Sequence, residues 1–168
     1  MGQIPADVVE ATWQRIGVAE GAVISALQRK CGLSQPELTA FVIGFTEDLR
    51  PDAMGLTLYA MVVVYEVFRV HHVKIRKARE RVVLRQWEMA RAFTEELRER
   101  GLSRRDILVA DINTAEPYAF RYVIEAFTEQ SEDDSIEISD DEFWQMLAVL
   151  RTVIETLHEM AGAEKRSV

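Results

Sequence analysis

Glu66, Glu155 and His158 are the residues whose side chains could together bind a metal ion. Glu155 and His158 have the Glu-x-x-His spacing by which two ligands project from one side of a helix in di-metal carboxylate bundles. Such a site needs a second Glu-x-x-His pair and two more carboxylates, whereas this sequence contains the motif once. On a helical wheel Glu155 lies away from the apolar stripe of its segment, which indicates a solvated face. A metal-binding, di-metal carboxylate-type bundle is therefore the alternative hypothesis.

Glu66 lies near the end of an apolar run, LTLYAMVVVYEVF, where a helical wheel places it on an otherwise buried face. A buried carboxylate needs a partner or a proton. Glu66 could be a metal ligand or an acid–base group with a raised pKa. The structural alternative is an ion pair with Arg69, one turn along, or a hydrogen bond to a tyrosine hydroxyl. We favour the structural pair, because buried ion pairs perturb pKa values without any catalytic role.

The other reactive residue types do not form a recognisable catalytic set. His71 and His72 are adjacent, so on a helix they point about 100° apart and cannot share one metal ion. We expect His72 to be a core or interface histidine. The single cysteine, Cys31, excludes an internal disulfide and is expected to be a packed thiol. Phosphate-binding glycine loops, paired-cysteine metal sites and nucleophile elbows are absent from the sequence, which favours a non-enzymatic protein and indicates no cofactor.

Seven Arg and Lys residues crowd into residues 66–87 of a chain whose formal net charge is −8. On a helical wheel four of them form a basic stripe along one edge: Lys74, Lys77, Arg81 and Arg85. A stripe of this kind suits phosphate contact. The acidic net charge and the lack of interleaved aromatic residues argue against nucleic acid, however.

An acidic segment at residues 129–142, with eight acids in fourteen residues, is the alternative partner for the basic stripe. Its central acids are Glu132, Asp133, Asp134 and Glu137. We expect the basic stripe to face this segment, within one molecule or across a dimer.

Periodicity of three to four residues, few Gly and Pro, and no clean alternation predict an all-α fold. A first helical region covers 7–30, with breaks at Gly17 or Gly21 and an end at Gly32. Capping boxes begin further helices at Ser34 and Ser139, Pro51 starts another, and Ser103 with Asp106 caps a short one.

Residues 57–100 contain no Gly or Pro, and a heptad seam runs through them. A single helix of that length would extend about 65 Å, whereas a compact domain of this size is about 40 Å across. The helix therefore either bends near His71 and His72 or projects to meet another molecule. The part of the seam expected at an interface comprises Tyr65, Phe68, His72, Ile75, Arg79, Val82, Gln86, Met89 and Phe93.

We predict a single all-helical domain over 1–168, a bundle of five to seven helices with frayed ends at 1–5 and 163–168. Similar sequences suggest a duplicated helical hairpin, 34–72 and 114–161, joined by a long central helix. The predicted function is that of a cytoplasmic, non-enzymatic interaction protein that forms a homodimer and binds neither nucleic acid nor membrane. Its biological role does not follow from the sequence.

Overall fold

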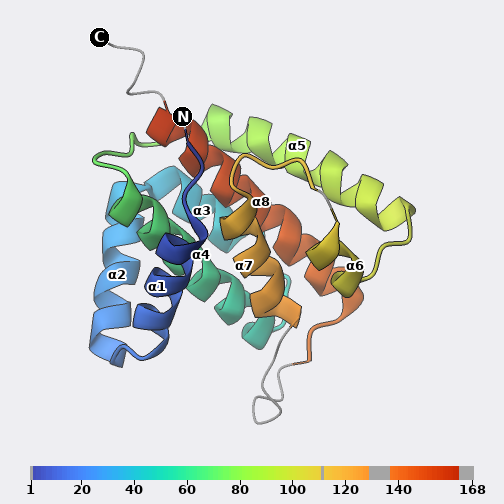
Figure 1. Cartoon of the computed structure of the whole chain (residues 1–168), viewed down its shortest axis with the longest axis horizontal. Coiled ribbons are helices and arrows are strands. Elements are labelled where there is room, and N and C mark those ends of the chain that lie inside the picture. The colour runs from blue at the N-terminus through green and yellow to red at the C-terminus, as the bar shows by residue number, and fades with distance from the viewer. Residues whose placement is uncertain (1, 111, 129–136, 163–168) are drawn as a thin grey trace.

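Eight α-helices and no strand make up the part of the chain that the computed structural model describes, residues 2–110, 112–128 and 137–162 (Figure 1). The helices are α1 (Ala6–Gly17), α2 (Gly21–Ser34), α3 (Pro36–Gly44), α4 (Pro51–His71), α5 (Glu80–Glu99), α6 (Arg104–Val109), α7 (Pro117–Thr128) and α8 (Asp140–Gly162). The all-α class is confirmed. The described residues form one helix more than the upper limit of the prediction.

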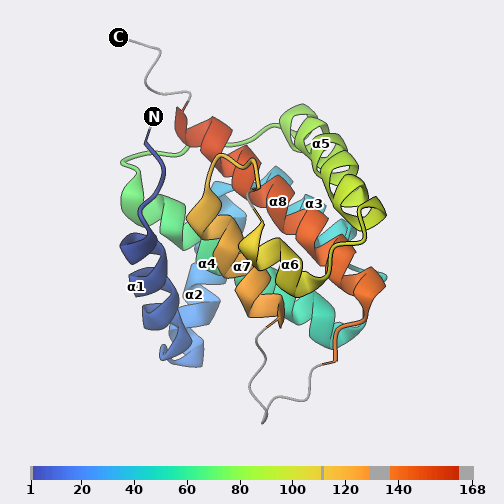
Figure 2. The same cartoon turned by 45° about the vertical axis from the view of Figure 1, so that its right-hand side comes forward.

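The long helices α4 and α8 form the centre of the molecule and pack against each other. Eleven residues of α4 and fourteen of α8 are buried. By length and composition α4 could cross a membrane, but most of its apolar window is buried inside the molecule, as in the core helix of a folded domain. In Figure 2, α5 lies along α8, while α1 lies on the opposite side of the molecule, where it packs on α4 and α7.

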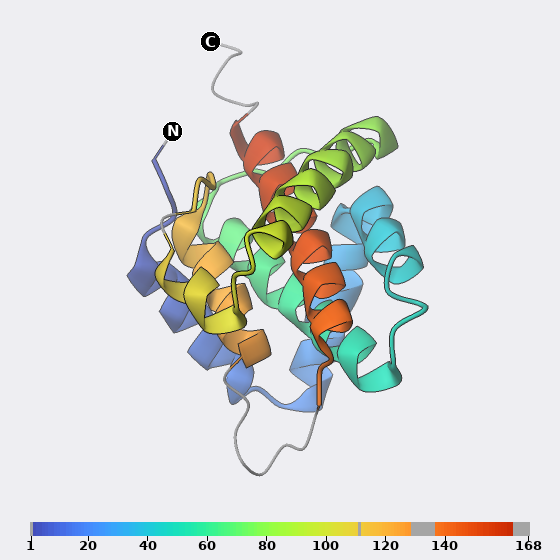
Figure 3. The same cartoon turned by 90° about the vertical axis from the view of Figure 1, so that its right-hand side faces the viewer.

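The long central helix is not continuous, because α4 ends at His71 and α5 begins at Glu80. Of the two expected alternatives, the change of direction near His71 and His72 is confirmed. Residues 72–79 form a non-helical connection between the two helices, which we call the strap (Figure 1). The strap contains neither Gly nor Pro, so its own residues do not explain the break. Instead, the side chain of Gln35 binds its backbone, and Ala78 is buried. Figure 3 shows that α5 does not continue the direction of α4 but crosses over α8.

Local signals located several helix ends correctly. The first helical region breaks between Gly17 and Gly21, Pro51 starts α4, and Gly101 follows α5 with a positive φ of 72°. Ser103 and Asp106 form a capping box at the start of α6. At α8, Ser139 Oγ accepts a 3.2 Å hydrogen bond from Glu142 N–H, and Glu142 Oε1 accepts one of 3.2 Å from Ser139 N–H.

Two helix-end predictions are wrong. Helix α2 passes through Gly32 and ends at Ser34, so Ser34 does not cap the next helix. Gln35 is the N-cap residue of α3, and its side chain makes no capping hydrogen bond. The Gln35 amide binds the strap instead.

The predicted duplicated hairpins each correspond to a shorter helix followed by a longer one, α3 with α4 and α7 with α8. That these two helix pairs arose by duplication stays a prediction. The expected fraying of residues 1–5 is wrong for Ile4, which is fully buried and donates a 2.8 Å hydrogen bond to Glu116. Residues 163–168 lie outside the described part of the chain.

Candidate functional site

The Gln35 side chain positions the strap. Gln35 is almost fully buried; its Nε2 donates a 2.9 Å hydrogen bond to the Arg76 carbonyl, and its Oε1 accepts a 3.0 Å hydrogen bond from Ala78 N–H. One primary amide thus binds the backbone on both sides of residue 77, as a neighbouring strand would. Ile75 packs on the core and Ala78 is buried, so the cationic side chains between and beside them are directed outward.

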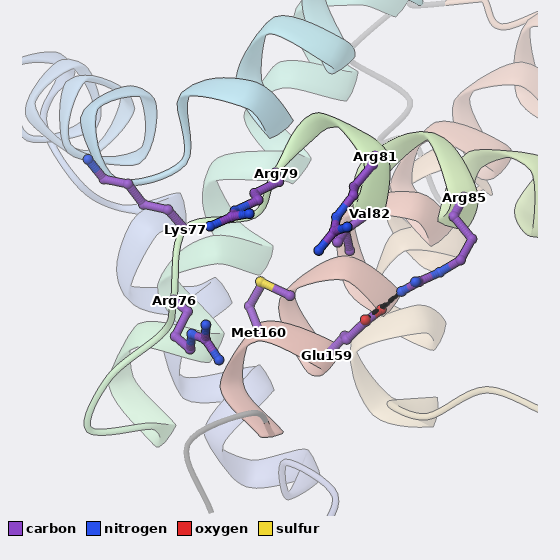
Figure 4. A pocket seen from close by; sticks show the side chains of 8 residues that line it. All are labelled: Arg76, Lys77, Arg79, Arg81, Val82, Arg85, Glu159 and Met160. Atoms are coloured by element: carbon purple, nitrogen blue, oxygen red, sulfur yellow. Dashed lines mark hydrogen bonds and ion pairs between the residues drawn. The ribbon is translucent and has the colours of Figure 1, made fainter. Parts of the chain in front are cut away.

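An open hollow of about 660 Å³ lies between the strap, the first turns of α5 and the last turns of α8 (Figure 4). We call it the basic hollow. Its lining residues are Arg76, Lys77, Arg79, Arg81, Val82, Arg85, Glu159 and Met160. Five cationic side chains against one carboxylate leave a formal excess of four positive charges. Figure 4 shows that these residues come from the strap, α5 and α8, with Met160 of α8 between Arg76 and Arg79, and that the Lys77 side chain points to the other side of the strap.

Glu159 is already bound inside the basic hollow. Both of its oxygens accept hydrogen bonds from Arg85 Nη2, and Oε2 accepts a further 2.9 Å bond from Gln86. The hydrogen bond from Arg85 lowers the pKa of Glu159, and burial opposes that shift only in part. The same contact raises the pKa of Arg85, so both groups stay charged at neutral pH.

The other four cations, Arg76, Lys77, Arg79 and Arg81, are exposed and form no ion pair with any described residue. A cluster of exposed cations that have no carboxylate partner is typical of a site for an anionic ligand. Guanidinium groups also match the planar, two-oxygen geometry of carboxylates and phosphates.

The predicted basic stripe is only partly correct. Lys74 and Lys77 lie on the strap, whereas Arg81 and Arg85 lie on α5, so the four are not one helical edge. Lys77, Arg81 and Arg85 do line the basic hollow. The helical wheel missed Arg76 and Arg79, because it assumed a continuous helix through residues that the structure shows as a strap.

Within one molecule, the acids Glu137, Asp140 and Asp141 of the acidic segment do not contact the basic hollow. Asp140 and Asp141 at the start of α8 bind Arg104 and Arg98. Asp141 precedes Glu159 by eighteen residues on one helix, which separates them by about 27 Å. Glu137 is exposed, and its carbonyl binds Arg50. The intramolecular contact is therefore wrong for these residues, while Glu132, Asp133 and Asp134 lie outside the described part of the chain.

The predicted heptad seam does not form one continuous surface. Tyr65 and Phe68 are buried in the monomer core, and the ring of His72 stacks on Phe68. Further along, Ile75, Val82 and Phe93 pack against the same core, Gln86 binds Glu159, and Arg79 lines the basic hollow. Met89 is 61% exposed. Most of this seam therefore faces the monomer's own core, and its buried residues are not available to a partner.

Glu66 forms the predicted structural pair. Arg69 Nε and Nη2 donate hydrogen bonds of 2.7 and 2.6 Å to its two oxygens, and Arg15 Nη2 on α1 adds a third of 3.2 Å. Burial raises the pKa of Glu66, but the hydrogen bonds and charges of Arg69 and Arg15 outweigh it and lower the pKa overall. An ionised carboxylate held by two guanidinium groups is not an acid–base group with a raised pKa.

Glu155 and His158 have separate partners. Glu155 is half-buried and not solvated as expected, because its Oε1 accepts hydrogen bonds from Thr114 Oγ1 (2.9 Å) and Ala115 N–H (3.3 Å). His158 Nδ1 lies 3.0 Å from Oε1 of Glu116. No group of three His, Cys, Asp or Glu side chains among the described residues could hold a metal ion. The alternative ligand set of Glu66, Glu155 and His158 is therefore not assembled.

Comparison of the chain with protein-family models, with curated proteins and with solved structures finds no match.

Proposed function

We propose that the protein is a cytoplasmic, non-enzymatic interaction protein that forms a homodimer, with the basic hollow of each copy binding an acidic segment of the other. The observation that carries the proposal is the excess of four positive charges in a hollow on a chain of net charge −8. The rest of the chain supplies acidic groups in abundance, above all at residues 129–137. Cys31, free and buried, fits a reducing compartment.

Two-fold symmetry would use the hollow and the acidic segment twice in each dimer, which doubles the electrostatic contribution. Exposed ion pairs contribute only about 0–1 kcal/mol each. Four or more of them acting together therefore give an association that weakens as salt screens the charges. This explains how a hollow lined mainly by charged side chains could serve as an interface without a large apolar patch.

The test is sedimentation velocity of the full chain at about 0.05 M salt and at about 0.5 M salt, where exposed ion pairs are strongly screened. The variant Arg76→Glu, Lys77→Glu, Arg81→Glu should shift the protein to monomer at low salt. Adding Asp133→Lys, Asp134→Lys and Glu137→Lys should restore the dimer. The control variant reverses three exposed cations elsewhere, Arg29, Lys30 and Arg105, and should dimerise like the wild type despite its equal change of net charge.

A wild-type protein that sediments as a monomer at high concentration and low salt contradicts the proposal. Tight binding of a mixed-sequence DNA or RNA near 0.15 M salt, abolished by the three hollow reversals, would show instead that the basic hollow binds a nucleic acid.

A further inference from the structure

At Arg76 and Ala78 the Gln35 side chain occupies one edge of the strap backbone. Gln35 binds the carbonyl of Arg76 and the N–H of Ala78. In an extended chain the N–H and C=O of one residue point to one edge, and those of the next residue point to the opposite edge. The N–H and C=O of Lys77, and those of Ile75 two residues before, therefore point away from Gln35.

No described residue forms a hydrogen bond with the backbone N–H or C=O of Ile75 or Lys77. Lys77 is exposed and Ile75 is half-buried. A short extended segment with a free hydrogen-bonding edge can accept another strand by main-chain pairing. Because Gln35 already holds the strap, an incoming strand would not have to order it first.

The side chains beside the strap decide what kind of strand it accepts. Figure 4 shows Lys77 pointing to the opposite side of the strap from Arg76, Arg79 and Met160, so cations flank the chain on both sides. A second copy of the strap would bring like charges together and is disfavoured. A peptide with carboxylates at neighbouring positions can place them against cations on either side.

We infer that the strap binds an extended acidic peptide as an added β-strand. Its main chain pairs with Lys77 and Ile75, and its carboxylates contact Arg76, Lys77 and Arg79. The inference rests on the proposed function and specifies its binding mode. The occupant is residues 129–137 of a second copy, EQSEDDSIE, which carries five acids in nine residues. At about 3.3 Å per residue, nine residues are more than long enough to pair with a strap of eight.

The experiment measures binding of a synthetic EQSEDDSIE peptide, fluorescently labelled and blocked at both ends, to the wild-type protein by anisotropy. Two further peptides are methylated on the backbone nitrogens of alternate residues, one at odd positions and one at even positions. Both keep every charge, and each removes the N–H groups of one strand edge. If the peptide adds as a strand, one methylated peptide should bind at least about tenfold more weakly than the parent peptide, because it loses two main-chain hydrogen bonds. The other should stay within about threefold of the parent peptide.

A protein-side comparison uses Lys77→Pro and Lys77→Met. Both remove the charge, but only proline removes the N–H while keeping a backbone suited to extended structure. The proline variant should bind the parent peptide more weakly than the methionine variant. If Lys77→Pro fails to fold, as circular dichroism would show, the methylated peptides still give the answer on wild-type protein.

The outcomes separate the two proposals. If the parent peptide does not bind, or binds the Arg76→Glu, Lys77→Glu, Arg81→Glu variant equally well, the basic hollow is not an acidic-peptide site and the proposed function fails. If the parent peptide needs those cations but the two methylated peptides bind alike, strand addition is overturned and the hollow holds acids through side chains alone.

Discussion

Nδ1 of His158 lies 3.0 Å from Oε1 of Glu116, whose fully buried carboxylate also accepts a 2.8 Å hydrogen bond from the backbone N–H of Ile4 through Oε2. These contacts join the N-terminal segment, the residue before α7 and the last turns of α8. They explain why Ile4 is ordered and buried so close to the chain end.

The Glu116–His158 contact makes stability depend on pH. Its hydrogen bond raises the pKa of His158; burial opposes the shift, while the charges of Glu116 and Glu155 support it. Protonated His158 therefore stabilises the fold fully below its unfolded pKa of about 6.5. This contribution is lost as the pH rises through the pKa of His158 in the folded state, which is higher. The free energy of unfolding, measured by urea titration from pH 5.5 to 9, should fall over that window, and His158→Gln should flatten the fall.

The matched control for His158 is His71→Gln, because His71 is exposed at the end of α4. It should leave the pH slope of the wild type unchanged. Identical slopes for wild type and His158→Gln would show that the contact with Glu116 does not stabilise the fold through protonation.

Replacing Gln35 tests its two hydrogen bonds to the strap backbone. Gln35→Ala leaves the Arg76 carbonyl and the Ala78 N–H without their partner, and Ala78 is buried. We expect a loss of about 1–3 kcal/mol in the free energy of unfolding, typical of buried polar groups left unsatisfied. Hydrogen exchange at the Ala78 amide should also become faster. Gln14→Ala, at an exposed helical glutamine, should change stability by less than about 0.5 kcal/mol. If the Ala78 amide of the wild type exchanges as fast as in an unfolded chain, its hydrogen bond to Gln35 does not form in solution.

Glu66→Gln tests the ion pair at the core edge. The neutral amide cannot balance Arg69 and Arg15, but these are 40% and 53% exposed and can turn to solvent. The loss should therefore be about 1–2 kcal/mol, below the 3–5 kcal/mol of a fully enclosed pair. Thermal and urea unfolding would measure it. Glu125→Gln, which breaks the exposed pair with Arg121, should cost less than about 1 kcal/mol. A melting temperature raised by zinc or iron in wild type but not in Glu66→Gln would restore the metal hypothesis.

Glu142 should govern part of the acid sensitivity. The hydrogen bond from Arg50, with those of Ser139, lowers the pKa of Glu142 to about 2 against the opposing effect of burial. A lowered folded pKa gives stability that is present above the unfolded value, about 4.5, and is lost as pH falls towards 2. Glu142→Gln should lower stability at pH 6 and weaken its dependence on pH between those values.

Acid titration followed by circular dichroism checks the Glu142 prediction. Glu88→Gln, at an exposed position of α5, is the control and should follow the wild-type curve. An unchanged acid curve for Glu142→Gln would mean that Arg50 and the capping box do not hold this carboxylate ionised in solution.

Local chemistry made much of this structure predictable from sequence. Helical periodicity gave the all-α class, and Pro51, Gly101 and the Ser139 capping box marked helix ends, because each acts within one or two turns of its own position. The pairing of Glu66 with Arg69 was predictable for the same reason, since three residues along a helix bring side chains together.

Contacts between distant segments decided the rest. The helix stops at the strap in a stretch without Gly or Pro, where the side-chain amide of Gln35, about forty residues earlier, binds the carbonyl of Arg76 and the N–H of Ala78. That break moved Arg76 and Arg79 into the basic hollow, while Tyr65 and Phe68 are buried where α4 packs in the core. Ile4 is ordered by Glu116, 112 residues away. Helix periodicity predicts a face only while the helix continues, and whether it continues here depends on hydrogen bonds that only the folded chain can make.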